Sequence, residues 1–150
     1  KELAGLSGRE RVLDLYSGVG GIALYLAPLA QSVQGIEEEG SAFRDACENA
    51  KLNGIRNVRF LPGRVERQKD VLSDADVVVV DPPRSGCSPE ALSALARSEA
   101  RRMIYVSCNP ATLARDVRFL AGKGFRLARV VPVDLFPQSF HIEAVARLER

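Results

Sequence analysis

Residues 11–21 read RVLDLYSGVGG, and this stretch gives the strongest indication of the fold. Residues 11–17 are mostly apolar, which is typical of a buried strand. The glycines that follow allow a tight turn, and residues 21–29 (GIALYLAPL) have helical spacing. A strand, a glycine turn and a helix in this order are typical of the opening unit of a parallel α/β sheet.

The same alternation of apolar runs and amphipathic stretches continues along the chain. We predict further strands at residues 32–37, 58–61, 76–81, 103–107, 125–133 and 142–148, and helices at residues 41–52, 89–97 and 110–121. Helices between strands indicate a mostly parallel sheet that is covered on both faces. The last two strands are joined by a short linker, so they should form an antiparallel hairpin. The predicted fold is one α/β domain, residues 1–150, with a doubly wound, Rossmann-like, seven-stranded sheet.

Composition restricts the class of protein. Of 150 residues, 46% are hydrophobic and 27% are charged, and the formal net charge is +2, as expected for a globular domain. Apolar runs such as VVVV at residues 77–80 are far shorter than the roughly 20 residues of a membrane span. No signal peptide is visible, and three cysteines without metal-ligand spacing argue against a zinc site. We expect a monomeric, cytoplasmic protein with no metal in this segment and no membrane partner.

The glycine turn lies between two carboxylates. GVGGIA, which contains Gly18, Gly20 and Gly21, satisfies G-x-G-x-x-G/A, and Glu37 closes the next strand about 20 residues on, as in dinucleotide binders. A carboxylate at Glu37 can accept hydrogen bonds from ribose hydroxyls. Asp14 would repel a pyrophosphate but attract an ammonium group, which favours S-adenosylmethionine over NAD. A turn that merely links a strand to a helix is the remaining alternative.

A stiff loop follows the fourth strand, in the sequence Asp81-Pro82-Pro83-Arg84. Each proline fixes its own φ and pushes the preceding residue towards an extended conformation. The loop therefore holds Asp81 beside the expected cofactor pocket, where it can orient a planar base. Arg84 can contact a phosphate, although a rigid loop with a surface arginine explains it equally well.

Cys108 precedes the helix predicted at residues 110–121. Asn109 is a suitable N-cap, and Pro110 suits the first helical position. The helix dipole and the nearby Arg115 favour a thiolate at Cys108, which makes this residue a candidate nucleophile. Inert packing is the alternative for a lone cysteine.

The other two cysteines are weaker candidates. Cys47 lies inside a predicted amphipathic helix, and its spacing is that of a core residue. Cys87 lies in the loop sequence SGCS, where we expect it to be incidental.

The segment between the last two strands, FPQSFHIE at residues 136–143, is rich in functional side chains. Phe136 and Phe140 can stack on a base or cap the core, and His141 is the only histidine. Glu143 begins a strand and is followed by apolar residues, which should raise its pKa and suit it to proton transfer. An exposed glutamate at a strand edge is the alternative.

A cofactor that donates methyl groups, a thiolate and a carboxylate base together suggest one reaction. Carbon 5 of uracil is a poor nucleophile until a thiolate adds to carbon 6. Carbon 5 then attacks the methyl group, a base removes the carbon-5 proton, and the thiolate leaves. Cys108, Glu143 and Asp81 fit the roles of nucleophile, base and ring-orienting group.

The sequence resembles the catalytic domain of the RNA uracil-5 methyltransferases, which form 5-methyluridine in tRNA and rRNA. The resemblance runs through LDLYSGVG, VQGIE, ENAKLNGIRNVRF, VVVDPPR, YVSCNPATLARD and DLFPQSFHIEAVARL. It implies that Cys108 is the nucleophile and Glu143 the proton acceptor. It also implies that Tyr16, Glu37 and Asp81 contact S-adenosylmethionine.

The resemblance implies an RNA substrate, a structured tRNA or rRNA whose target uridine leaves its stack to reach the pocket. We expect Asp81, Pro82, Arg84, Asn109 and Arg115 to contact that substrate. Members of the family usually carry an N-terminal RNA-binding barrel, so the chain is expected to be a fragment that lacks this region.

Two other functions remain open at this point. A methyltransferase for an exocyclic base amine would use Asp-Pro-Pro to position the nitrogen and would need no thiol. A fragment that binds S-adenosylmethionine or RNA without catalysis would show binding and no turnover.

Overall fold

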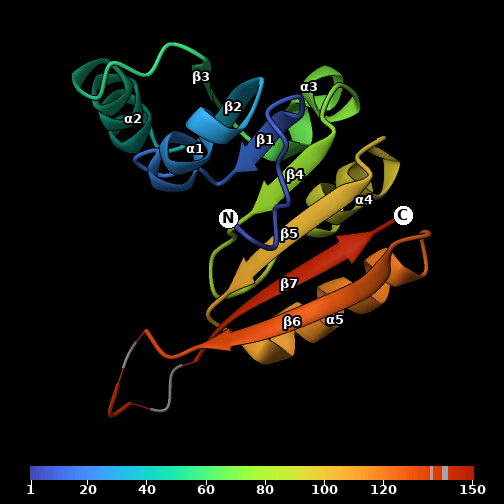
Figure 1. Ribbon diagram of the computed structural model, residues 1–150. Helices are drawn as coiled ribbons and strands as arrows, with labels where there is room; N and C mark the ends of the chain where they lie inside the picture. The colour runs from blue at the N-terminus through green and yellow to red at the C-terminus, as the bar shows by residue number, and fades with distance from the viewer. Residues whose placement is uncertain (136, 140–141) are drawn as a thin grey trace.

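In the computed structural model, the chain forms one twisted sheet with helices on both faces (Figure 1). The structure describes residues 1–135, 137–139 and 142–150, and for residues 69 and 70 only the backbone. The strands are β1 (Arg11–Leu15), β2 (Ser32–Glu37), β3 (Val58–Pro62), β4 (Val77–Val80), β5 (Arg102–Ser107), β6 (Arg126–Val133) and β7 (Glu143–Glu149). The helices are α1 (Gly21–Leu26), α2 (Gly40–Leu52), α3 (Lys69–Ser73), α4 (Pro89–Arg97) and α5 (Pro110–Ala121), with 3-10 turns η1 (Ala27–Leu29) and η2 (Val65–Arg67).

The strand order is β3-β2-β1-β4-β5-β7-β6, and β1 to β5 run parallel. β7 lies antiparallel to both β5 and β6, which confirms the predicted C-terminal hairpin. The chain winds outward from β1 in one direction and from β4 in the other. In such sheets ligands bind outside the carboxyl ends of the strands at this switch point. The fold therefore directs attention to the residues that follow β1 and β4.

Several boundaries differ from the sequence prediction. α1 ends at Leu26 and continues as the 3-10 turn η1, because Pro28 has no N–H to donate to an α-helical bond. β1 ends at Leu15 because Tyr16 turns the chain with φ 61°. β7 begins at Glu143, one residue later than predicted. The turn η2 and the short helix α3 lie between β3 and β4, where the sequence predicts no helix or strand.

Two buried clusters fill the space between the sheet and its helices. One lies on the side of α4 and α5 and includes Leu13, Leu15 and Val80, and the other lies on the side of α1 and α2 and includes Val12 and Val79. This division follows the alternation of side chains along each strand. All four valines of β4 are buried, because helices cover both faces of the sheet there.

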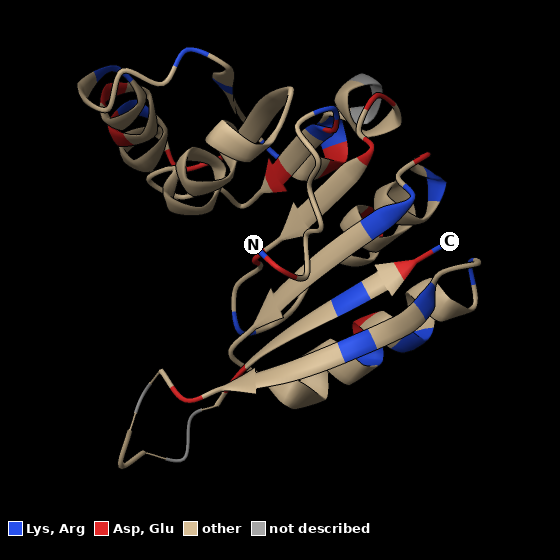
Figure 2. Ribbon diagram, in the orientation of Figure 1, with Lys and Arg blue, Asp and Glu red and all other residues tan. Residues whose placement is uncertain are grey.

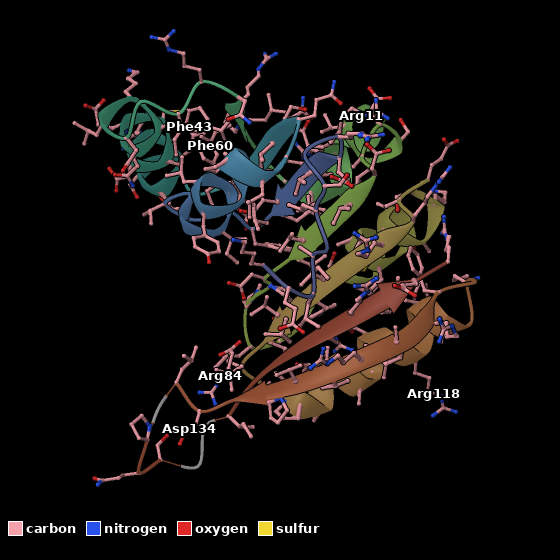
Figure 3. All side chains as sticks on the ribbon, viewed as in Figure 1. Arg11, Phe43, Phe60, Arg84, Arg118 and Asp134 are labelled. Carbon is pink, nitrogen blue, oxygen red and sulfur yellow. The ribbon has the colours of Figure 1, made fainter. Side chains whose placement is uncertain are left out.

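Gly35 explains how β2 and β3 pack beside the glycine turn. A Cβ built on Gly35 would lie 2.4 Å from Phe60 Cδ1, so the ring of Phe60 occupies the space that a side chain would need. The same ring lies 2.7 Å from a Cβ built on Gly20, which has φ 87°. Phe60 on β3, labelled in Figure 3, therefore packs beneath both β2 and the turn after β1.

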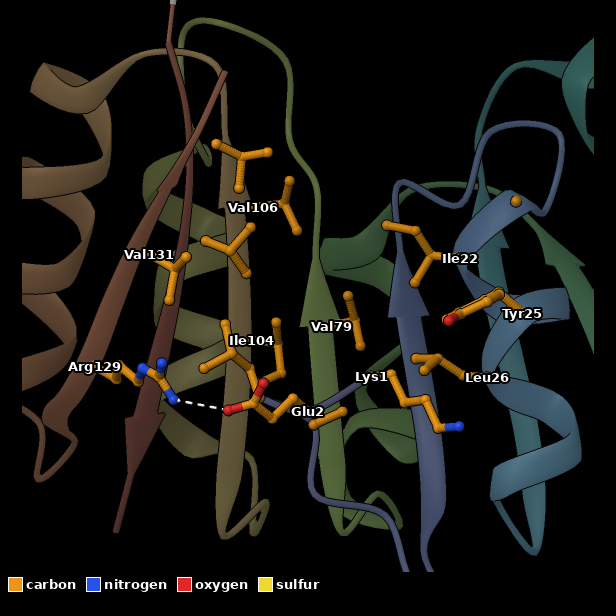
Figure 4. A pocket seen from close by; sticks show the side chains of 15 residues that line it. Lys1, Glu2, Ile22, Tyr25, Leu26, Val79, Ile104, Val106, Arg129 and Val131 are labelled. Atoms are coloured by element: carbon orange, nitrogen blue, oxygen red, sulfur yellow. Dashed lines mark hydrogen bonds and ion pairs between the residues drawn. The ribbon is translucent and has the colours of Figure 1, made fainter. Parts of the chain in front are cut away.

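A hollow of about 470 Å³ lies between α1 and the strands β4 to β7 (Figure 4). Its wall is mostly apolar, and an ion pair of 3.0 Å joins Glu2 to Arg129 at one side. Basic residues lie on β5, β6 and β7 (Figure 2), and the side chains of Arg102 and Arg147 donate hydrogen bonds to backbone oxygens of residues 3–5. The first residues of the chain are thereby fixed to the sheet.

No helix in the described part of the chain is long and apolar enough to cross a membrane.

Candidate active site at the carboxyl ends of the strands

The turn after β1 has an unusual backbone. Tyr16, Gly18 and Gly20 have φ values of 61°, 54° and 87°, and a positive φ is uncommon for a residue with a side chain. The turn is closed by a hydrogen bond from the N–H of Gly20 to the carbonyl of Ser17, at 2.8 Å. Strain of this kind gathers at ligand sites, so the turn is a candidate binding element.

Asp14 lies below this turn, and its side chain is almost completely buried. Its Oδ2 accepts a hydrogen bond of 2.9 Å from the N–H of Ala23, in the first turn of α1. Among the described residues, Asp14 Oδ1 and Ser17 Oγ are buried without a hydrogen-bond partner. Burial, with smaller contributions from the charges of Asp81 and Glu37, raises the pKa of Asp14 to about 7. Such a carboxylate suits a cationic partner.

Glu37, the last residue of β2, is tied to the same turn. Its Oε2 accepts a hydrogen bond of 2.8 Å from the N–H of Gly18, and its Oε1 accepts one of 2.7 Å from the N–H of Glu39. Each carboxylate oxygen has a further acceptor position. The two backbone bonds fix the orientation of the carboxylate, and the remaining positions suit a pair of hydroxyl groups.

A second hollow, of about 440 Å³, opens beside these residues at the ends of β1 to β4. Its wall includes Tyr16, Ile36, Val65 and Pro83, and at the rim Arg64 Nε lies 3.0 Å from Glu38 Oε2. Apolar walls with a few polar groups suit a planar base. Ile36, Glu38 and Val65 are not among the predicted site residues. The end of β2 could have indicated Ile36 and Glu38, whereas Val65 begins the turn η2, which the sequence does not predict.

Asp81 directly follows β4, and its N–H donates to the carbonyl of Leu15 at 3.3 Å. Partial desolvation raises its pKa. Pro82 is buried, whereas Arg84 is exposed at the strand-end edge of the molecule (Figure 3). Asp81 thus lies beside the end of β1, and Arg84 lies further along the loop.

The register of β5 and β7 gives Cys108 and Glu143 neighbouring positions in the sheet. The pair Ser107 and Ala144 ends the antiparallel ladder, so Cys108 and Glu143 are the next residues on the two strands. Cys108 is partly exposed and Glu143 is buried. Burial and the charge of Asp81 raise the pKa of Glu143, as the sequence predicts. The effect of the Asp81 charge also relates Glu143 to the loop after β4.

Four side chains lie in environments that the sequence specified only in part. Cys87 is not incidental, since it is buried and lies 3.6 Å from the hydroxyl of Tyr105. Arg115 donates hydrogen bonds to Asp116 and to two loop carbonyls, while Arg118 points away from the strand ends (Figure 3). Cys47 is only partly buried, although it packs against the core on the side of α1 and α2.

The structure also describes two further predicted residues, Gly21 and Asn109. Gly21 begins α1 and lines the hollow near the N-terminus instead of the one beside Tyr16. Asn109 caps α5 and donates to the carbonyl of Arg84 at 3.2 Å. Phe136, Phe140 and His141 lie outside the described residues. Within the described part, no group of three or more His, Cys, Asp or Glu residues could hold a metal ion.

The strand order, the glycine turn between two carboxylates and the antiparallel β7 define a class: the Rossmann-like methyltransferases. Solved structures with low identity show the same fold. A precorrin-6y C5,15-methyltransferase from Geobacter metallireducens, 18% identical, superposes on 99% of this chain with a TM-score of 0.82 and is itself covered to 84%.

The chain belongs to the tRNA (uracil-5-)-methyltransferase family, whose model matches residues 4–150. An uncharacterized RNA methyltransferase from Caldanaerobacter subterraneus subsp. tengcongensis is 48% identical over 99% of this chain. The tRNA (uracil-54, C5)-methyltransferase of Pyrococcus abyssi, solved with S-adenosyl-L-homocysteine, is 35% identical and superposes on 98% of this chain with a TM-score of 0.87. The chain spans only 34% of the first relative and 36% of the second.

Proposed function

We propose that the chain uses S-adenosylmethionine to methylate carbon 5 of a uridine in tRNA or rRNA, through a covalent bond between Cys108 and carbon 6. The observation that carries this proposal is the strand register, in which Cys108 and Glu143 directly follow the last pair of the β5–β7 ladder. Membership of the family and the likeness to the Pyrococcus abyssi enzyme support the same reaction.

The residues at the ends of β1 and β2 fit S-adenosylmethionine, which supplies the methyl group when bound. The buried Asp14 Oδ1, which has no partner among the described residues, suits the ammonium group of the cofactor. The fixed carboxylate of Glu37 suits the ribose hydroxyls. The hollow beside Tyr16 suits the adenine, with Arg64 and Glu38 at its rim.

The side chains at the ends of β4, β5 and β7 serve the uracil ring. The Cys108 thiolate adds to carbon 6, and the electron pair displaced from the double bond makes carbon 5 nucleophilic. After carbon 5 has taken the methyl group, the Glu143 carboxylate accepts the carbon-5 proton. The double bond re-forms as the sulfur leaves with its electron pair. A carboxylate whose pKa is raised accepts this proton more readily than an exposed one.

The target uridine must leave its stack to reach these groups, and Asp81 is placed to hold the ring once it has done so. Arg84, exposed at the same edge, suits an RNA phosphate. The net charge of +2 supplies little general attraction to RNA. We therefore assign most of the RNA affinity to a region that corresponds to the part of the longer relatives outside this chain.

We expect the affinity for S-adenosylmethionine to rise as the pH rises through about 7. The pKa of Asp14 is raised to about 7, so binding of an ammonium at lower pH must release a proton from this carboxyl. The dissociation constant should fall about fivefold from pH 6 to a minimum between about pH 7 and pH 8, and it should rise again at higher pH, because the α-amino group of the ligand loses its proton with a pKa near 8. Calorimetry on the chain and on Asp14→Asn checks this, and an unchanged slope in the variant contradicts the assignment.

The proposed function is tested by the product. The longer parent protein is incubated with unmodified tRNA or rRNA and S-adenosylmethionine labelled in the methyl group, and the digested nucleosides are identified by mass spectrometry. The label should appear in 5-methyluridine. Label in a nucleoside methylated on an exocyclic amine would replace the proposal with that activity, and binding without label in RNA would favour a non-catalytic function.

A further inference from the structure

We propose that Asp116 is a positioning residue that fixes the loop after β4 onto α5 and thereby sets the placement of Asp81 relative to Cys108. Asp81 begins this loop, and Cys108 stands one residue before the N-cap of α5. The inference rests on the proposed function, because it concerns how two groups assigned to the uracil step are held.

Asp116 receives hydrogen bonds from three separate segments, and its side chain is completely buried. Its Oδ2 accepts from the hydroxyl of Tyr105 on β5 at 2.5 Å and from the N–H of Cys87 in the loop at 2.8 Å. Its Oδ1 accepts from Arg115 Nε at 2.8 Å. One carboxylate thus joins the strand that leads to Cys108, the helix that follows it and the loop that begins at Asp81.

The loop is shaped to approach Asp116 closely. Gly86 has φ 77°, and a Cβ built there would lie 2.7 Å from Asp116 Oδ2 and 2.5 Å from a terminal nitrogen of Arg115. That arginine also donates to the carbonyl of Ser85 at 3.0 Å and to that of Cys87 at 3.3 Å. A side chain at position 86 would therefore displace the loop from the helix.

The first turn of α5 holds the part of the loop nearest to Asp81. Asn109 Nδ2 and Thr112 Oγ1 each donate to the carbonyl of Arg84 at 3.2 Å. The loop is thus bonded to α5 at two levels, near the N-cap and one turn further along. These contacts leave little freedom for Asp81 to move relative to Cys108.

The presence of a buried carboxylate at position 116 supports a positioning role for this residue. A buried ionised group has a large desolvation penalty, and an apolar side chain of similar volume is often at least as stable. A carboxylate with three donors is, however, directional, and a fully bonded buried network favours one arrangement of its segments. Cys87 and Tyr16 line the same hollow, so the network reaches the turn assigned to the cofactor.

The test compares Asp116→Asn with Leu120→Val, a buried substitution one turn further along the same helix. The full 150-residue chain is treated with N-ethylmaleimide, and the alkylation rate of Cys87 is followed by peptide mass spectrometry at a temperature equally far below each melting point. Buried thiols react through opening of the structure, so local release of the loop raises this rate without global unfolding. Tyr105→Phe, which removes a single donor, serves if Asp116→Asn does not fold.

We expect alkylation of Cys87 to be about 100-fold faster in Asp116→Asn and about tenfold faster in Tyr105→Phe than in the parent chain, as the loss of buried hydrogen bonds implies. In Leu120→Val the rate should change by less than about twofold, because no bond to the loop is lost. Equal acceleration in the leucine variant and the network variants would overturn the proposal, since it would show a general effect on stability.

A second readout separates this inference from the proposed function. In the longer parent, Asp116→Asn should slow covalent capture of RNA that contains 5-fluorouridine by at least about tenfold while the S-adenosylmethionine affinity stays within about twofold. Unchanged capture by the variant would overturn the positioning role and leave the proposed function intact. If the unsubstituted parent captures no RNA, the proposed function fails, and the Cys87 rates alone decide whether Asp116 holds the loop.

Discussion

Cys108→Ala should abolish methyl transfer to RNA, by at least about 1000-fold, because without the thiolate carbon 5 of uracil has no route to becoming nucleophilic. The effect should fall on turnover and not on the cofactor. Cys108 follows β5, whereas the groups assigned to S-adenosylmethionine lie at the ends of β1 and β2. Methylation of RNA by the longer parent and calorimetry of cofactor binding measure the two separately.

Cys47→Ala is the matched control for this substitution. It also removes a partly buried thiol, but from α2 and away from the strand-end edge. Methylation by this variant should remain within about threefold of the parent, as expected for a change in packing alone. Appreciable methylation by Cys108→Ala would contradict the covalent route and favour methylation of an exocyclic amine.

Glu143→Gln should trap the protein on ordinary RNA. Glutamine keeps the size of the side chain but cannot accept the carbon-5 proton, so the bond from sulfur to carbon 6 persists after the methyl group has been transferred. Loss of a general base lowers turnover by about 100- to 10,000-fold. A band that resists denaturation and contains both protein and methylated RNA should therefore accumulate on a gel.

Glu149→Gln is the control for the glutamate. Glu149 lies at the other end of β7, where Arg147 and Arg126 pair with it and lower its pKa. This variant should turn over normally and leave no trapped RNA. Normal turnover by Glu143→Gln would remove Glu143 from the role of base.

Much of the fold could be predicted because hydrophobic periodicity reports which side chains face the core. The seven strands, the mostly parallel sheet and the antiparallel β7 follow from alternating apolar runs and from one short linker. The end of β1 could not be predicted, since nothing in the sequence marks Tyr16 as a residue with a positive φ. The short helix α3 was missed because its five residues do not show a helical period.

Part of the candidate site could likewise be predicted from the sequence, and part could not. Asp14, Glu37 and Asp81 could be selected because each ends, or lies near the end of, a strand whose position in the sheet follows from the pattern. The environment of Cys87 could not, because it depends on Tyr105 and Asp116, which reach the loop only when β5 and α5 have packed. Contacts between distant segments leave no local pattern in the sequence.

The most direct test of the account uses RNA that contains 5-fluorouridine. Fluorine at carbon 5 leaves no proton for Glu143 to accept, so an enzyme of this mechanism stalls while it is covalently attached. With S-adenosylmethionine present, the longer parent should form a protein–RNA adduct that resists denaturation, and peptide mass spectrometry should locate the attachment at Cys108. Methylation of ordinary RNA without any adduct, or attachment at a residue other than Cys108, would contradict the account.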